Sequence, residues 1–168
     1  MIRVVLVILV ACLIGSACQP SVRFRSAKKT RNINHTVDRN SYSKADDLNA
    51  FVHDWLHTPY KYGGMSREGV DCSGFTSLVM LHVYNIPAPR TAQEQYNNGR
   101  KLSDSRRVRG DLVFFRNVRR KGVDHVGIYL GDGKFAHATE SAGVIISDLD
   151  EDYYRKRYFG ACRYGNQN

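Results

Sequence analysis

One cysteine and two histidines stand in segments whose chemistry fits together. Cys72 lies in DCSGF, directly before an apolar run, while His125 lies in DHVGIYLGDG and His137 in KFAHAT. A thiol at the start of a helix is favoured as a thiolate, because the helix dipole and a nearby imidazolium both stabilise negative charge there. One imidazole can take and return the proton while another group fixes its tautomer. The pattern predicts a cysteine peptidase with Cys72 as nucleophile, His125 as general base and acid, and His137 as orienting residue.

Taken singly, each of these residues has a simpler explanation. A lone buried cysteine is usually a small apolar residue, and a lone histidine is usually a structural hydrogen-bonding group. A competing site is HDWLH at 53–57, whose two histidines have the i, i+4 spacing of a zinc motif. Asp54 stands where that motif has the longer glutamate, and no third ligand is evident, so we interpret His53 and His57 as surface or helix-end residues. The sequence has no CxxC pair, and we expect no metal and no cofactor.

The elements that must position these residues follow from periodicity. Apolar residues recur at helical spacing over residues 45–56, before a loop that starts at Pro59. A second apolar helix is expected over 73–83, directly after the cysteine, and a short helix near 91–97. Beyond residue 109 the period becomes that of strands, in the segments DLVFFR, HVGIYLG, KFAHAT, VIISDL and FGACRY. This order predicts an α+β fold in which the nucleophile helix packs on an antiparallel sheet.

The two histidines are expected on neighbouring strands of one hairpin. GDG at 131–133 is a hairpin-turn signal. Strand alternation puts His125, Gly127 and Tyr129 on one face and the intervening apolar residues on the other. With the turn at GDG, His137 lies close to His125 across the strand pair, so we expect a hydrogen bond between the two imidazoles.

The N-terminus carries the features of an export signal. Arg3 precedes an apolar run over 4–14 that is too short to span a membrane, and small residues precede Cys18. This order predicts a lipid anchor on Cys18; the alternative is an ordinary secretory peptide cut nearby. The polar, basic segment that follows is expected to be flexible. The expected organisation is a signal peptide (1–17), a lipidated N-terminus with a flexible tether (18–44) and the cysteine peptidase domain (45–168).

Export also bears on the remaining cysteines and on the charge. With Cys12 removed and Cys18 lipidated, a disulfide between Cys72 and Cys162 would block the nucleophile, so we expect Cys162 to be a free, half-buried thiol within a strand.

The formal charge of +9 becomes +8 without Arg3, from 24 basic and 16 acidic residues. We expect anionic cell-wall polymer or lipid headgroups as partners and no nucleic acid, because the basic stretches contain few aromatic residues for stacking on bases.

Seven segments stand in a characteristic order: TPYKYGG, GVDCSGF, APRTAQEQ, RGDLVFF, DHVGIYLGDGKFAHAT, GVIISDL and YFGACRY. Together they resemble the NlpC/p60 family of cell-wall cysteine peptidases, and within it the single-domain murein endopeptidase lipoproteins of Gram-negative bacteria. The resemblance runs from about residue 46 to 164. It implies a minimal papain-like α+β domain with a catalytic triad of Cys72, His125 and His137.

The resemblance also implies roles for three neighbouring residues. Tyr60 of the TPY segment matches a position that helps to form the oxyanion hole. Asp71 and Ser73 match positions that bind the free amine of a stem peptide, and a carboxylate at Asp71 suits an ammonium group. Arg90 and Gln95 match family positions to which the sequence assigns no role.

The implied reaction is hydrolysis of an amide in the peptide stems of peptidoglycan. The lipoprotein subgroup favours the cross-link between D-alanine and meso-diaminopimelate, whereas an amine site at Asp71 favours the bond between γ-D-glutamate and meso-diaminopimelate. Two other classes are a papain-like acyltransferase, which needs an apolar channel near Cys72, and an inactive wall-binding lipoprotein, which should lack a triad member. The expected protein is a monomer on the periplasmic side of a bacterial membrane, with the outer membrane favoured and a lipid anchor as its attachment.

Overall fold

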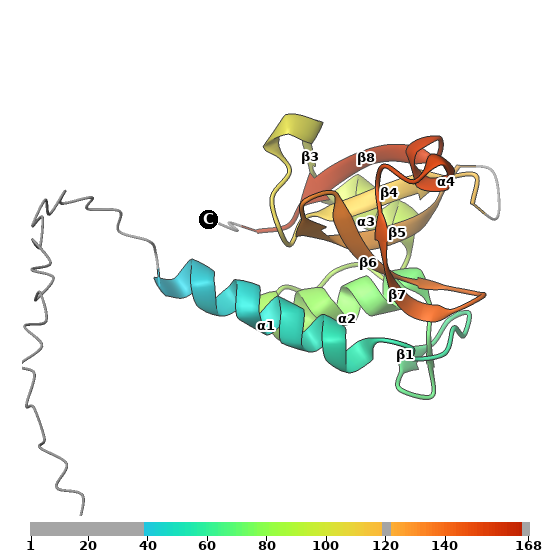
Figure 1. The fold of residues 1–168 in the computed structure, drawn as a ribbon, viewed down its shortest axis with the longest axis horizontal. Coiled ribbons are helices and arrows are strands. Elements are labelled where there is room, and N and C mark those ends of the chain that lie inside the picture. Colours follow the sequence, from blue (N-terminus) through green and yellow to red (C-terminus); the bar gives the residue numbers. More distant parts are fainter. Residues whose placement is uncertain (1–38, 119–121, 166–168) are drawn as a thin grey trace, which may run out of the picture. The chain divides into compact units, whose positions relative to one another are not determined.

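The computed structural model describes residues 39–118 and 122–165, which lie in the unit Thr36–Asn168. The elements in chain order are α1 (Arg39–Trp55), β1 (Met65–Ser66), β2 (Gly69–Val70), α2 (Cys72–Tyr84), α3 (Ala92–Asn98), β3 (Arg100–Leu102), the 3₁₀ helix η1 (Asp104–Arg106), β4 (Leu112–Arg116), β5 (Val123–Gly131), β6 (Lys134–Thr139), β7 (Gly143–Asp148), α4 (Asp152–Arg155) and β8 (Tyr158–Arg163). Helices come first and antiparallel strands follow (Figure 1), which confirms the α+β prediction. Among the described helices, none has the length and apolar character needed to cross a bilayer. The predicted signal peptide and the predicted lipidation site at Cys18 lie outside the described residues.

Six strands form one antiparallel sheet in the order β3-β8-β4-β5-β6-β7, and β1 and β2 pair separately. Helices α1 and α2 run beside each other along one side of this sheet (Figure 1). Strands β5 and β6 form the expected hairpin, with Tyr129 opposite Phe135 and Gly131 opposite Lys134. Helix α2, which begins at Cys72, packs on the sheet as the sequence predicts, with Phe75 and Val79 in one buried cluster with Val126 of β5.

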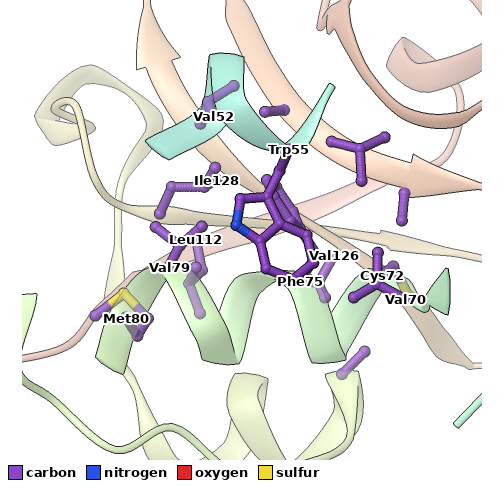
Figure 2. Close-up of a cluster of buried hydrophobic side chains, with 14 of the residues drawn as sticks. Val52, Trp55, Val70, Cys72, Phe75, Val79, Met80, Leu112, Val126 and Ile128 are labelled. Atoms are coloured by element: carbon purple, nitrogen blue, oxygen red, sulfur yellow. The ribbon is translucent and has the colours of Figure 1, made fainter. Parts of the chain in front are cut away.

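Strand alternation divides the buried side chains into two clusters. The cluster between helices and sheet includes Val52, Trp55, Phe75, Val79, Leu112, Val126 and Ile128 (Figure 2). The cluster on the other face of the sheet includes Val113, Phe115 and Phe135, with Tyr154 of α4 packed against them. Burying each of these large side chains contributes about 1.5–3 kcal/mol, so the two clusters hold α2 and α4 to the sheet. His125 contacts Phe115 with its ring, which confirms the alternation expected for β5.

Capping residues determine where the helices near the site begin and end. Asp71 caps α2 by accepting a hydrogen bond from the Gly74 N–H, and Asn85 ends the helix in the left-handed conformation with φ of 55°. Thr91 starts α3 through a capping box with Glu94. The predicted helices at 73–83 and 91–97 are confirmed, with their ends shifted by about a residue.

The structure differs from the sequence expectations at short elements and at the start of α1. This helix begins at Arg39, so residues 39–44, which their polar composition assigns to the tether, are helical. Those residues lack apolar periodicity, and a helix can extend into them at one hydrogen bond per residue once its packed part has formed. Strands β1, β2 and β3 and helix α4 have two to four residues each, too few for a periodic pattern to reveal.

Candidate active site

Cys72 is the first residue of α2, as the sequence predicts, and only 3% of it is exposed. It lies at the end of the helix–sheet cluster, near Val70 (Figure 2). Its side chain lines a cavity of about 190 Å³ that is also lined by Asp71, Ser73, Arg90 and Asp124. The N–H dipoles at the start of a helix stabilise negative charge, so this position favours the thiolate form of Cys72.

The carboxylate of Asp71 is engaged by five protein donors. It accepts hydrogen bonds from the backbone N–H groups of Gly63 (2.8 Å) and Gly74 (2.7 Å), from the Ser73 hydroxyl (3.2 Å) and from both Nη atoms of Arg90 (2.9 and 2.8 Å). Burial raises the pKa of Asp71, but the hydrogen bonds from Arg90 and the two backbone groups outweigh it and lower the pKa overall. A carboxylate offers about four lone-pair positions. The protein itself therefore saturates the group that the family resemblance assigns to a substrate amine.

Arg90, which the sequence leaves without a role, is bonded to this helix cap and lies close enough to Cys72 to interact with its charge. One Nη atom also donates to the Gly64 carbonyl, at 3.3 Å. The pKa of Arg90 is raised, first by its hydrogen bond to Asp71, although burial acts in the opposite direction, and further by negative charge on Cys72. This attraction is mutual, so the guanidinium stabilises a thiolate at Cys72.

We expect Asp71→Asn to lower the free energy of unfolding by about 1–3 kcal/mol at neutral pH, because an amide N–H₂ would face the donors of Gly63 and Arg90. The lower half of this range is expected, because the Arg90 side chain is 35% exposed. The folded-state pKa of Asp71 is lowered, so its ionised form stabilises the fold fully above the unfolded pKa of about 3.9, and this contribution is lost as the pH falls through the folded pKa.

Urea unfolding at several pH values, followed by Trp55 fluorescence, measures this effect. The stability difference between wild type and Asp71→Asn should be constant between about pH 5 and 7 and should shrink below about pH 4. Asp150→Asn, at an exposed carboxylate, is the matched control and should change stability little. A stability difference for Asp71→Asn that persists unchanged to strongly acidic pH would contradict a stabilising role of the ionised Asp71 carboxylate.

His125 of β5 and His137 of β6 form the expected hydrogen bond. Nε2 of His125 is 2.8 Å from Nδ1 of His137, and the two rings are nearly perpendicular, at 88°. Ile128 pairs with Ala136 in this hairpin, so the two histidines are diagonal neighbours rather than direct partners. Such a diagonal spacing is within reach of aromatic side chains. The prediction of an imidazole pair is confirmed.

His137 has surroundings that keep it neutral. It is fully buried, and its ring stacks on Phe135 (centroids 4.6 Å apart) and contacts Tyr154 edge-on at 5.2 Å. Its Nε2 lies 3.0 Å from the Oγ of Ser147 in β7. Burial, and then the charge of His125, lower the pKa of His137 well below the ordinary histidine value. Sequence reasoning missed Ser147 and Tyr154; the signal for Ser147 is a hydroxyl within the apolar strand VIISDL, and Tyr154 lies in the short helix α4 that follows it.

Gly127 makes the close approach of β5 and β6 at the histidines feasible. A Cβ atom at this position would lie 2.6 Å from the Phe135 ring, 2.8 Å from the Ala136 carbonyl oxygen and 3.2 Å from the Cβ of His137. The carbonyl oxygen belongs to the backbone of the neighbouring strand and cannot move without disturbing the sheet. The glycine in HVG therefore leaves the space in which the imidazole pair is packed.

Tyr60 and Asp124 line the cavities beside Cys72 and His125. Tyr60 forms a parallel bridge with Val70, two residues before Cys72, and lines a cavity of about 380 Å³ with His125. Asp124, the neighbour of His125 in β5, lines the smaller cavity of Cys72. Each cavity is thus lined by β5 and by a segment near Cys72. This segment is the loop of Tyr60 in the larger cavity and the start of α2 in the smaller one.

The two histidines of the competing HDWLH segment do not lie on one helix. His53 is exposed on α1, whereas His57 lies beyond the end of that helix and has a positive φ of 66°. The two imidazoles therefore do not follow each other on one helix face, which the zinc interpretation requires.

Cys162 is a free thiol in β8, as expected, but it is fully buried rather than half-buried. Its Sγ donates to the Gln95 carbonyl (3.7 Å) and lies against Gly99, where an added Cβ would come within 2.2 Å of the sulfur. Burial raises the pKa of this thiol to about 12. Cys162 is therefore a packing residue, and the exposure predicted for it is wrong because the short strand β3 and the end of α3 cover it.

This chain matches the model of a known protein family and is similar to known bacterial proteins. The model of the NlpC/P60 family matches residues 57–163. The probable endopeptidase NlpC of Escherichia coli (strain K12) is 40% identical over 116 residues, which are 69% of this chain and 75% of that protein. A probable endopeptidase NlpC homolog of Haemophilus influenzae is 40% identical over 123 residues, 73% of this chain and 64% of the relative. The murein DD-endopeptidase MepS/murein LD-carboxypeptidase of E. coli K12 is 42% identical over 110 residues, 66% and 57% of the two chains.

Solved structures show the same fold. An NlpC/P60 family protein from Bacillus cereus ATCC 10987 superposes with a TM-score of 0.66 at 36% sequence identity, over 71% of this chain and 40% of that one. The NlpC/p60 domain of the peptidoglycan hydrolase SagA superposes with a TM-score of 0.61 at 30% identity, over 71% of this chain and 98% of that one. The six-stranded sheet and the helix that begins at Cys72 thus belong to a fold already seen by crystallography.

Proposed function

Because the chain belongs to the NlpC/P60 family, we propose that it is a cysteine endopeptidase that hydrolyses an amide in the peptide part of peptidoglycan. The observation that carries this proposal is the 2.8 Å hydrogen bond between His125 and His137. An imidazole whose Nε2 is held by a second imidazole keeps its Nδ1 for proton transfer. The start of the same strand reaches the cavity of Cys72 through Asp124.

In the proposed mechanism, Cys72 gives its proton to Nδ1 of His125 and attacks the substrate carbonyl as a thiolate. The backbone N–H of Cys72 and the hydroxyl of Tyr60 donate to the oxyanion of the tetrahedral intermediate. The imidazolium of His125 protonates the leaving amine, and a thioester remains on Cys72. Water then gives a proton to His125 and attacks the thioester, which releases the acid and restores the thiol.

For the bond that is cut, we propose the cross-link between D-alanine and meso-diaminopimelate. The five donors on Asp71 leave it no capacity for a substrate ammonium, which weighs against recognition of a free stem N-terminus. The E. coli relatives MepS and MepH are named murein DD-endopeptidases. The alternative is the γ-D-glutamyl–meso-diaminopimelate bond; a Bacillus subtilis relative, 38% identical over 113 residues, is named a gamma-DL-glutamyl hydrolase.

Two other classes have less support. An acyltransferase needs an apolar channel at the nucleophile, whereas Asp71, Ser73 and Arg90 line the cavity of Cys72. An inactive wall-binding protein should lack a member of the triad, whereas Cys72 is present and the two imidazoles are joined. The first observation favours a peptide amide over a lipid acyl group, and the second favours an active enzyme.

The proposal includes the location of the enzyme. A lipid on Cys18 would hold a monomer at the periplasmic side of a membrane, with the outer membrane favoured because Gln19 rather than aspartate follows the cysteine. Peptidoglycan lies next to that surface, so the anchor would keep the enzyme near its substrate.

Digestion of purified peptidoglycan by the full-length protein in mild detergent, followed by mass spectrometry, tests the function. We expect cross-linked dimers to disappear and tetrapeptide monomers to accumulate. Release of L-alanyl-γ-D-glutamate would favour the alternative bond. If no product forms beyond that seen with Cys72→Ala, the proposed substrate class is wrong.

A further inference from the structure

We propose that Ser147 is a positioning residue, whose hydroxyl oxygen accepts the Nε2–H of His137 and so fixes the tautomer with which His137 holds His125. The catalytic role of Ser147 rests on the proposed function, whereas the tautomer of His137 is a property of the resting protein. Ser147 in turn gives its own proton to the hydroxyl of Tyr154. The catalytic histidine would thus be oriented by a chain of three groups rather than by His137 alone.

The geometry of β6, β7 and α4 places these groups in line. Ser147 pairs with Phe135 across the β6–β7 ladder, while His137 pairs with Ile145, so Ser147 and His137 are diagonal neighbours on one face. The Oγ of Ser147 lies 3.0 Å from Nε2 of His137 and donates to the Tyr154 hydroxyl over a longer distance of 3.5 Å. Ser147 is only 7% exposed, which limits competition from bulk water for these bonds.

The reaction requires that the ring proton of neutral His137 lie on Nε2. The imidazolium of His125 carries N–H groups at both ring nitrogens and can only donate. Nδ1 of His137, at 2.8 Å, must then be the acceptor, and the single proton of neutral His137 must sit on Nε2. That buried N–H needs an acceptor, and the oxygen of Ser147 is in hydrogen-bond position. If Ser147 donated to Nε2 instead, His137 would present an N–H to the N–H of His125.

The groups that face His137 fit this assignment. They are His125, Ser147 and the rings of Phe135 and Tyr154. Burial, which raises the pKa of Tyr154, keeps its hydroxyl neutral and able to accept from Ser147. Burial also keeps His137 neutral when His125 is charged, so His137 chooses between two tautomers rather than gaining a second proton.

Nitrogen NMR of the full-length protein in mild detergent, labelled with ¹⁵N-histidine, tests the proposal without any substrate. Wild-type His137 should show a protonated Nε2 and an unprotonated Nδ1 near neutral pH. In Ser147→Ala the Nε2–H loses its acceptor, so the tautomer ratio should shift by about 10-fold toward Nδ1–H. Murein hydrolysis should fall in kcat by about the same factor, with KM little changed, because the substrate does not touch Ser147.

Three further variants separate positioning from packing. Ser147→Thr keeps a hydroxyl and should restore the wild-type tautomer and most of the rate. Tyr154→Phe should have a smaller effect, because its bond to Ser147 is long. Ser77→Ala is the matched control, since it removes another buried serine hydroxyl, which is bonded to Pro89 and Gln95 rather than to either imidazole. It should leave the histidine spectrum and the rate unchanged.

The NMR result decides the proposal independently of the substrate. A wild-type His137 protonated at Nδ1, or an unchanged tautomer in Ser147→Ala, would overturn it even if the rate fell. If the wild type shows the expected tautomer but no activity on murein, the role of Ser147 in fixing the tautomer stands and the proposed function fails.

Discussion

Cys72→Ala should abolish murein hydrolysis and lower the free energy of unfolding by no more than about 1 kcal/mol, since it removes one small buried atom. The thiolate is the only group in the proposed mechanism that forms a covalent bond to the substrate, so neither histidine can replace it. Asp71 and Gly74, which form the cap of α2, are unchanged in this variant. The helix start should therefore persist without its nucleophile.

Product release measured by chromatography, together with a thermal melt, checks this expectation. Cys162→Ala is the matched control and should keep the wild-type rate, with a melting temperature lowered at least as much as in Cys72→Ala, because its sulfur is fully buried against Gly99. Iodoacetamide at neutral pH should alkylate Cys72 and spare Cys162, whose pKa burial raises to about 12. If Cys72→Ala hydrolyses murein faster than a blank without enzyme, Cys72 is not the nucleophile.

Local patterns in the sequence suffice for the parts of the site that lie on regular elements. The period of HVGIYLG and the turn signal GDG place His125 and His137 on one face of one hairpin, and the structure joins them. The apolar run after Cys72 likewise predicts a helix that begins at the thiol. In both cases the functional residue has a fixed offset from a strong local signal.

The parts that the sequence does not reveal depend on contacts between distant segments. Arg90 reaches the cap of α2 from the loop before α3, and Ser147 reaches His137 from the neighbouring strand. Tyr154 belongs to a helix of four residues, whose position follows from packing on Phe115 and Phe135. Such neighbours become visible only once the register of the strands is known.

The second large effect is expected from replacing the histidines of the imidazole pair. His125→Ala should lower kcat by about 10³-fold, since a general base and acid contributes on the order of 10²–10⁴. His137→Ala should lower it by about 10²-fold, because His125 stays in place but loses the partner of its Nε2–H. The double variant should be no slower than His125→Ala, since His137 acts only through His125 and has nothing to orient once that ring is gone.

This lack of additivity separates an orienting histidine from a second, independent catalyst. Rates of the three variants on one peptidoglycan preparation give the coupling directly, and His53→Ala, at an exposed imidazole on α1, should match the wild type. If the two single losses multiplied in the double variant, His137 would have to touch the substrate or the thiol by itself. The 2.8 Å contact to His125 and the complete burial of His137 argue against that, because the ring has a histidine on one nitrogen and a serine on the other. Multiplied losses would therefore require a different geometry in the enzyme–substrate complex from the one described for the resting chain.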